Sequence, residues 1–151
     1  MLLVRQRYRF DCGVAAVATV TQVPYDAVLD RLVSGLSSTE AMSEVVVWRT
    51  LQDITRTPWC MEELWSPWPQ VGGYSFSAAP TIVLIQRADG SRHYIAVCGG
   101  QVYDPLMAVP LALTEYPDRG SYVVTVFRAG ASEGDSSTGL LHQGTGDARW
   151  R

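Results

Sequence analysis

The chain has 151 residues, of which 47% are hydrophobic and 18% are charged, and its formal net charge is −3 at pH 7. This length suits one domain with a sizeable core, and an acidic balance without any basic run argues against nucleic acid as a partner. No apolar run approaches the ~20 residues of a membrane span, and the apolar start at residues 1–4 is too short for a signal peptide. We therefore expect a cytoplasmic protein.

The three cysteines give no sign of a metal site or of a disulfide framework. Cys12, Cys60 and Cys98 have no CxxC spacing and no histidine cluster beside them. Their odd number also argues against a set of disulfides in a chain of this size. We expect reduced thiols, no bound metal and no cofactor. Cys60 and Cys98 are expected to be packing residues, which leaves Cys12 as the thiol with a chemical role.

Residues 1–57 are predicted to be mainly helical. Asp11 is placed to cap a helix that begins near Cys12 and runs through small apolar residues to about Thr21. Pro24 then opens a second helix, because proline suits the first helical turn. The apolar residues expected mostly on one face of this second helix are Ala27, Val28, Leu29, Leu32 and Val33.

A third helix is predicted to follow. Ser37, with Glu40 three residues later, resembles a capping box that would begin it. The residues expected on its buried side are Met42, Val45, Val46 and Leu51. The β-branched run at residues 45–47 weakens the helical preference of this stretch slightly.

The second half of the chain is predicted to be a sheet that follows an aromatic loop. Prolines separate the tryptophans of residues 58–80, so we predict a loop-rich segment with at most one short strand. Residues 81–128 then alternate β-branched runs with glycine-containing turns, which is typical of antiparallel strands. The predicted strands are Thr81–Gln86, Arg92–Cys98, Gln101–Tyr103, Pro110–Leu113 and Ser121–Arg128.

The last residues differ in composition from the rest of the chain. Residues 129–151 are dominated by Gly, Ser, Thr and Asp, and such a segment cannot bury enough apolar surface to fold alone. We therefore divide the chain into a folded domain, residues 1–128, and a polar C-terminal segment, residues 129–151. Where that segment is ordered, we expect a protein partner or a second copy of the chain to hold it.

Four residues have the chemistry of an acyl-transfer site. Cys12 stands at a predicted helix N-terminus, where unpaired N–H groups and the helix dipole favour a thiolate, and Gly13 leaves room for a substrate carbonyl. His93 is the one histidine of the folded part, and a strand would hold its ring as a general base. Asp104 follows about one hairpin later and could accept the other ring N–H. Gln6 could donate to an oxyanion together with the backbone N–H of Cys12.

These residues, in this order, resemble the peptidases that remove double-glycine leader peptides from bacteriocins, and their standalone relatives. The segments that carry the resemblance are Gln6, Asp11-Cys12-Gly13, His93-Tyr94 and Val102-Tyr103-Asp104-Pro105. The resemblance covers roughly residues 6–128. It implies an α+β, papain-like fold in which N-terminal helices, with the cysteine on the central one, pack on a C-terminal antiparallel sheet.

The resemblance also implies a function. The chain would be a cysteine peptidase that acts on a peptide or protein substrate, with Cys12 as nucleophile and His93 as base. Asp104 would orient the histidine, and Gln6 would be the oxyanion residue.

Other interpretations stay open. Trp59, Trp65 and Trp68 are expected to anchor the core and loops, although with Gly13 they are also candidates for binding the substrate. The same fold could serve a cell-wall peptide hydrolase, but those enzymes usually follow Asp-Cys with serine, and this chain has Gly13. A third interpretation is an inactive assembly or interaction protein, such as a phage virion component, that uses residues 129–151 as its adhesive segment.

Overall fold

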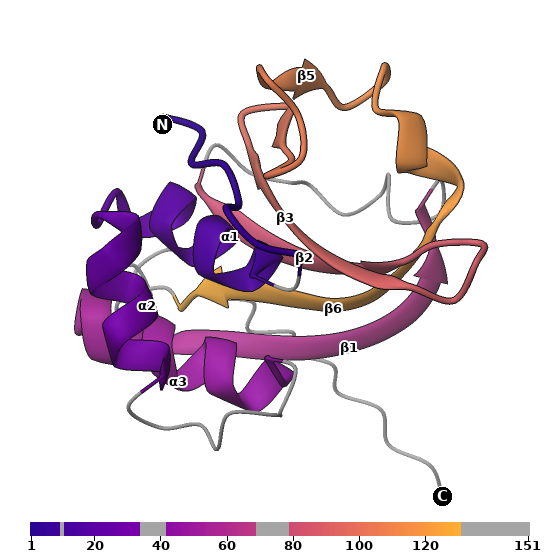
Figure 1. Cartoon of the computed structure of the whole chain (residues 1–151). Coiled ribbons are helices and arrows are strands. Elements are labelled where there is room, and N and C mark those ends of the chain that lie inside the picture. The colour runs from indigo at the N-terminus through magenta and orange to yellow at the C-terminus, as the bar shows by residue number, and fades with distance from the viewer. Residues whose placement is uncertain (10, 34–41, 69–78, 131–151) are drawn as a thin grey trace, which may run out of the picture.

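The protein folds as a layer of helices on an antiparallel sheet (Figure 1). The computed structural model describes residues 1–9, 11–33, 42–68 and 79–130. Three helices come first in the chain, and six strands follow. The predicted α+β arrangement, with N-terminal helices on a C-terminal antiparallel sheet, is confirmed. No helix within the described ranges has the length and hydropathy that crossing a membrane requires.

The first two helices follow the predictions. Helix α1 spans Cys12–Thr21, and its small residues are almost completely buried. Helix α2 spans Tyr25–Val33, and the Val28 N–H donates to the Pro24 carbonyl oxygen at 3.1 Å. One expectation for α2 is wrong: Ala27 is exposed, because the helix turns Tyr25, Val28 and Leu32 toward the core instead.

Helix α3 differs from its predicted form. It spans Glu44–Thr55, with Ser43 at the N-cap position, and the predicted capping box of Ser37 and Glu40 lies outside the described residues. Val47 and Leu51 are fully buried, whereas Val45, predicted to face the core, is exposed. The buried face of α3 is therefore rotated relative to the predicted one. Its buried residues, Val47, Thr50 and Leu51, share the side of the helix that meets the sheet.

The six strands form one sheet in the order β1-β6-β2-β3-β4-β5. Their bounds are β1 Trp59–Pro67, β2 Thr81–Gln86, β3 Arg92–Cys98, β4 Gln101–Tyr103, β5 Leu111–Ala112 and β6 Tyr122–Ala129. Strands β2, β3 and β4 have the predicted bounds, and β5 and β6 lie within one or two residues of theirs. Strand β1 is a correction, because it is longer than the short strand expected there. Its one proline, Pro67, is tolerated because β1 lies at the sheet edge.

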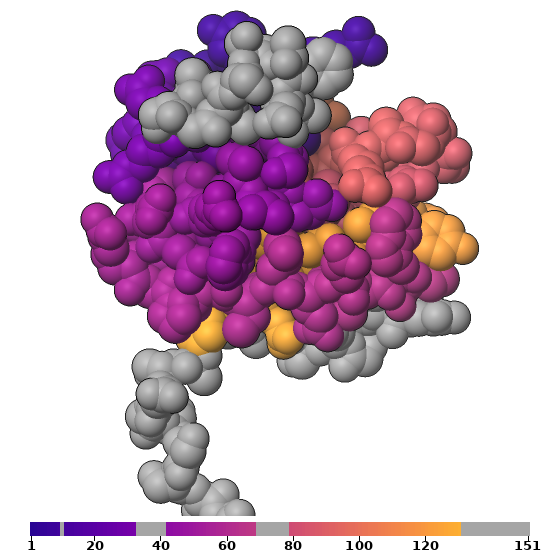
Figure 2. All heavy atoms as spheres, turned by 90° about the horizontal axis from the view of Figure 1, so that it is seen from below, coloured from indigo at the N-terminus to yellow at the C-terminus, as the bar shows by residue number. Residues whose placement is uncertain are grey.

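Strand alternation divides the core into two clusters, one on each face of the sheet. Leu84 and Tyr94 face the helices, whereas their neighbours Val83 and Ile95 face a second cluster that Trp68 and Tyr116 cover. Figure 2 shows the helical side from below, where α3 lies along β1 and the turn between β2 and β3 projects beyond them. The helices thus leave one end of the sheet uncovered, and the pocket opens there.

The C-terminal boundary lies slightly later than predicted. Strand β6 continues to Ala129, and the Gly130 N–H donates to the Pro58 carbonyl oxygen at 2.7 Å. Of the predicted polar segment 129–151, residues 131–151 lie outside the described residues. The division between domain and tail therefore stays a prediction.

Candidate active site

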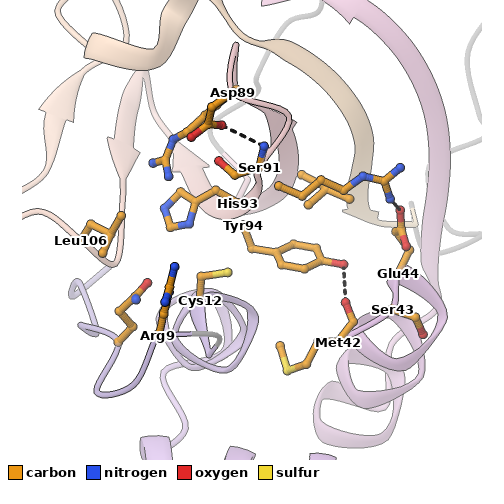
Figure 3. Close-up of a pocket in the computed structure, with 14 residues that line it drawn as sticks. Arg9, Cys12, Met42, Ser43, Glu44, Asp89, Ser91, His93, Tyr94 and Leu106 are labelled. Carbon is orange, nitrogen blue, oxygen red and sulfur yellow. Dashed lines mark hydrogen bonds and ion pairs between the residues drawn. The ribbon is translucent and has the colours of Figure 1, made fainter. Parts of the chain in front are cut away.

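A pocket of about 680 Å³ lies where the N-terminus of α1 meets β3. This volume is in the range of ordinary ligand sites. Figure 3 shows the His93 ring above Cys12, with Leu106 on one side of it and the Tyr94 ring on the other. The residues that line the pocket are Gln6, Arg9, Cys12, Met42, Ser43, Glu44, Leu84, Arg87, Asp89, Ser91, Arg92, His93, Tyr94 and Leu106.

Helix α1 brings Cys12 to the sheet because its residues are small. Gly13 is fully packed against β3: a Cβ added there would lie 3.2 Å from the Tyr94 ring and would collide with the end of the Met42 side chain. Glycine therefore permits the close approach of the helix to the strand. The Asp11 side chain, predicted to cap α1, forms no capping hydrogen bond. Cys12 is nevertheless the first helical residue, as predicted.

The sheet places His93 beside Asp104 because β4 is shorter than β3. Strand β4 pairs with Ala96–Cys98 and ends at Tyr103, opposite Ala96. The chain then turns away, so Asp104 meets the part of β3 that β4 no longer covers. The His93 Nε2 atom lies 2.7 Å from Asp104 Oδ1, and both side chains are buried.

The Asp104 carboxylate has a donor on every side. Oδ1 also accepts the Leu106 N–H at 2.8 Å, Oδ2 accepts the Tyr116 hydroxyl at 2.7 Å, and Arg87 lies 3.9 Å from Oδ2. Burial raises the pKa of Asp104, but the hydrogen bond from His93, its charge and the other donors outweigh burial and hold this pKa below its usual value. Asp104 is therefore an anion that cannot easily rotate.

Cys12 and His93 line the same pocket and stabilise each other's charge. Burial raises the pKa of the Cys12 thiol, but the hydrogen bond to His93, the Tyr94 backbone N–H and the imidazolium charge outweigh burial, so this pKa lies below its usual value. Burial lowers the pKa of His93, whereas its hydrogen bonds to Asp104 and Cys12 raise it, to about 9. These opposite shifts favour a thiolate–imidazolium pair. Since Asp104 takes Nε2, Nδ1 is the ring nitrogen left for Cys12.

Gln6 lines the same pocket from the N-terminal segment. Its backbone N–H donates to the Pro105 carbonyl at 3.2 Å, and its side-chain Nε2 donates to the Tyr8 carbonyl at 3.0 Å. An amide nitrogen carries two hydrogens. Among the described residues, Tyr8 accepts one of those on Nε2, which leaves the second for a substrate. Gln6 thus places an amide donor in the pocket that Cys12 also lines, and its oxyanion role stays a prediction.

The three tryptophans predicted as candidates for substrate binding, Trp59, Trp65 and Trp68, do not line the pocket. Trp59 and Trp68 are 7% exposed and belong to the cores on opposite faces of the sheet. Trp65 is 49% exposed, and the guanidinium carbon of Arg92, a pocket residue, lies 5.5 Å from its ring centroid. Of the three, Trp65 is therefore the one whose ring borders the site.

Comparison with known structures finds the same arrangement of elements in a peptidase. The chain is similar to the peptidase domain of Streptococcus mutans ComA, which was solved in complex with a small-molecule inhibitor. The TM-score is 0.54 at 14% sequence identity, over 86% of this chain and 99% of that domain. The two chains share a fold. The predicted papain-like fold is confirmed. No protein-family model and no curated protein sequence matches the chain.

Sequence reasoning missed several residues that complete the site. The Tyr94 backbone N–H interacts with Cys12, and the Tyr116 hydroxyl and the Arg87 guanidinium lie against Asp104. Tyr94 follows His93 directly in the sequence, whereas Tyr116 lies twelve residues after Asp104 and meets it only in the folded structure. Cys60, expected as a packing residue, is exposed on the edge strand β1.

Proposed function

We propose that this protein is a cysteine peptidase that hydrolyses a peptide or isopeptide bond through a thioester. The observation that carries the proposal is the series of half-buried Cys12, buried His93 and buried Asp104, in which the pKa of the thiol is lowered and that of the histidine is raised. Such a pair supplies a nucleophile and a proton donor together at neutral pH. The fold shared with a peptidase domain supports the same conclusion.

In the first half of the reaction, the Cys12 thiolate attacks the carbonyl carbon and the C=O π electrons move to oxygen. The backbone N–H of Cys12, in the first turn of α1, and the Gln6 amide bind this oxyanion. When the oxyanion collapses, the C–N bond breaks and His93 gives its Nδ1 proton to the leaving amine. The acyl group is then held as a thioester on Cys12.

In the second half, the neutral His93 accepts a proton from water, and the resulting hydroxide attacks the thioester carbon. A second oxyanion forms in the same place and collapses with cleavage of the C–S bond. The carboxylic acid leaves, and the thiolate–imidazolium pair is restored. Asp104 keeps its charge throughout and stabilises the imidazolium from the Nε2 side.

The two ends of the pocket suit the two halves of the substrate. The leaving amine must lie near His93, so the acyl half extends the other way, over the Tyr94 ring toward Met42 and Glu44 (Figure 3). Glu44 accepts a hydrogen bond from Arg92 at 3.2 Å, and Arg92 lies over the Trp65 ring. We assign Trp65 to the outer end of the acyl side, with Gly13 beneath the pocket as the residue that keeps the helix close.

The test compares thiol reactivity in the intact protein. Iodoacetamide should alkylate Cys12 much faster than Cys60, although Cys60 is the exposed thiol, and mass spectrometry of tryptic peptides measures each rate. His93→Ala should slow Cys12 at pH 6 by more than about tenfold, because the ion pair is lost, and should leave Cys60 unchanged. Equal rates at the two thiols, insensitive to His93, would contradict the proposal and favour the interaction-protein alternative.

A further inference from the structure

Asp11 makes a cluster of contacts that the proposed mechanism does not use. Its carboxylate is buried, and Oδ2 accepts the backbone N–H groups of Arg7 and Tyr8, each at 3.0 Å. The same oxygen accepts the hydroxyl of Tyr25, the first residue of α2. One buried carboxylate oxygen therefore joins the N-terminal segment, the start of α1 and the start of α2.

A second interaction holds the cluster from outside. The Arg7 guanidinium lies over the Tyr25 ring, with its carbon 4.3 Å from the ring centroid, and donates to Asp26 at 2.6 Å. The Tyr25 ring is thus packed under a cation while its hydroxyl points at Asp11. We call Arg7, Tyr8, Asp11 and Tyr25 the Asp11 cluster.

The Asp11 cluster is connected to Gln6 through one residue. Asp11 holds the Tyr8 N–H, and the Tyr8 carbonyl accepts the side-chain amide of Gln6 at 3.0 Å. Gln6 Oε1 is buried, and no described residue hydrogen-bonds to it, so the contact with Tyr8 is what orients this amide. The orientation of Gln6 therefore depends on the turn that Asp11 and Tyr25 fix.

We propose that Asp11 and Tyr25 are positioning residues that aim the Gln6 amide at the substrate oxyanion. Tyr25 anchors the Asp11 carboxylate, the carboxylate fixes the turn at residues 7–8, and the turn orients Gln6. This inference rests on the proposed peptidase function, because it concerns the oxyanion site of that reaction. It assigns to the buried Asp beside the nucleophile a role that differs from helix capping.

The proposed positioning role of Asp11 and Tyr25 predicts different effects on two reactions of the Cys12 thiol. Alkylation by iodoacetamide is a displacement at a saturated carbon and forms no oxyanion, so it depends on the Cys12–His93 pair alone. Acylation by 4-nitrophenyl acetate passes through a tetrahedral oxyanion and releases 4-nitrophenolate, so it also depends on the oxyanion donors. A residue that acts through Gln6 should affect the second reaction and spare the first.

The test measures both reactions in the full chain, with the acylation rate of Cys12→Ala subtracted. Tyr25→Phe should slow acylation by about tenfold, within the ~10²–10³ that loss of an oxyanion donor can cost, while alkylation stays within about twofold. Gln6→Ala should show the same split, and adding Tyr25→Phe to it should cause little further loss, because both changes remove one function. Tyr122→Phe, at an exposed tyrosine, is the matched control and should leave both rates unchanged.

Unchanged acylation in Tyr25→Phe would overturn the proposal, and so would equal losses in the two reactions. Additive losses in the double variant would do so as well, since they indicate independent roles. If Tyr25→Phe does not fold, Arg7→Ala replaces it, because it removes the cation over the same ring from an exposed position, and about a threefold loss confined to acylation is expected. Rapid alkylation of wild-type Cys12 without any acylation would instead refute the peptidase function.

Discussion

The two halves of the candidate site are held in different ways. On the sheet side, His93 sits in a central strand, and its partner Asp104 accepts three hydrogen bonds and lies near Arg87. On the N-terminal side, Gln6 belongs to a segment without regular structure, and its side chain is oriented by a single contact to Tyr8. The proposed base therefore has several redundant supports, whereas the proposed oxyanion donor depends on a short series of contacts.

This difference shows where the site is sensitive to mutation. In a sheet, the loss of one contact changes the position of a strand little, because the neighbouring strand pairs keep the register. A segment held by a few side-chain hydrogen bonds has no such support, so one lost hydroxyl can change its geometry without unfolding the domain. We expect single hydroxyl deletions to be better tolerated around Asp104 than around Asp11.

The largest effect expected on the sheet side comes from removing the charge of Asp104. Asp104→Asn should lower the rate of peptide hydrolysis by about a hundredfold, because an amide can hold the ring but cannot stabilise the imidazolium. The pKa of His93 is about 9 in the wild type, and hydrolysis should fall above it as the proton donor is lost. In Asp104→Asn this alkaline limb should move to lower pH, since the anion that raises the pKa is gone.

The matching measurement is the pH profile of hydrolysis in wild type and variant. The acidic limb reports Cys12, whose pKa is lowered, and should lie below the usual range of a thiol in the wild type. An alkaline limb that does not move in Asp104→Asn would show that Asp104 orients the ring without affecting its charge.

A smaller effect is expected from Tyr116→Phe, which removes one of the donors to Asp104. Hydrolysis should change by less than about threefold because the other donors keep the carboxylate in place, while the free energy of unfolding should fall by about 1 kcal/mol. Tyr103→Phe is the matched control, since its hydroxyl donates to Gln101 at 3.2 Å, away from the catalytic residues. A tenfold loss of activity in Tyr116→Phe alone would refute the redundancy of the sheet side.

The smallest effect is expected from changing Trp65, which belongs neither to the sheet side nor to the N-terminal side of the candidate site. Trp65 has a φ of 45° at an irregularity of β1, a costly conformation for a bulky residue, and such positions often aim side chains at functional sites. Trp65→Ala should raise KM by about twofold, leave kcat unchanged and leave the melting temperature unchanged or slightly higher. Met61→Ala, at another exposed residue of β1, should leave KM unchanged, and a loss in kcat at Trp65 would contradict its place at the pocket rim.

Much of the fold was readable because its signals are local. The bounds of α1, β2, β3 and β4 follow from runs of apolar residues between turns, and the structure has them as predicted. The errors occurred where tertiary packing, and not local sequence, determines which residues are buried and which segments pair. Val45 looked suitable for a core face, but the side of α3 that meets the sheet begins at Val47. The length of strand β1 was missed because Pro58 precedes it and Pro67 ends it, whereas pairing with β6 outweighs these local preferences at an edge.

The sequence by itself determined the chemical candidates: a thiol at a helix start, one histidine in a strand, an aspartate after the next strand and a glutamine six residues before the thiol. These assignments depend on residue type and local spacing alone. Only the tertiary structure decided how they are supported. Tyr116 meets Asp104 through a loop, and Tyr25 meets Asp11 through the packing of α2 on α1. The spacing of these residues along the chain matches neither the helical nor the strand repeat. Only the folded arrangement therefore brings them together.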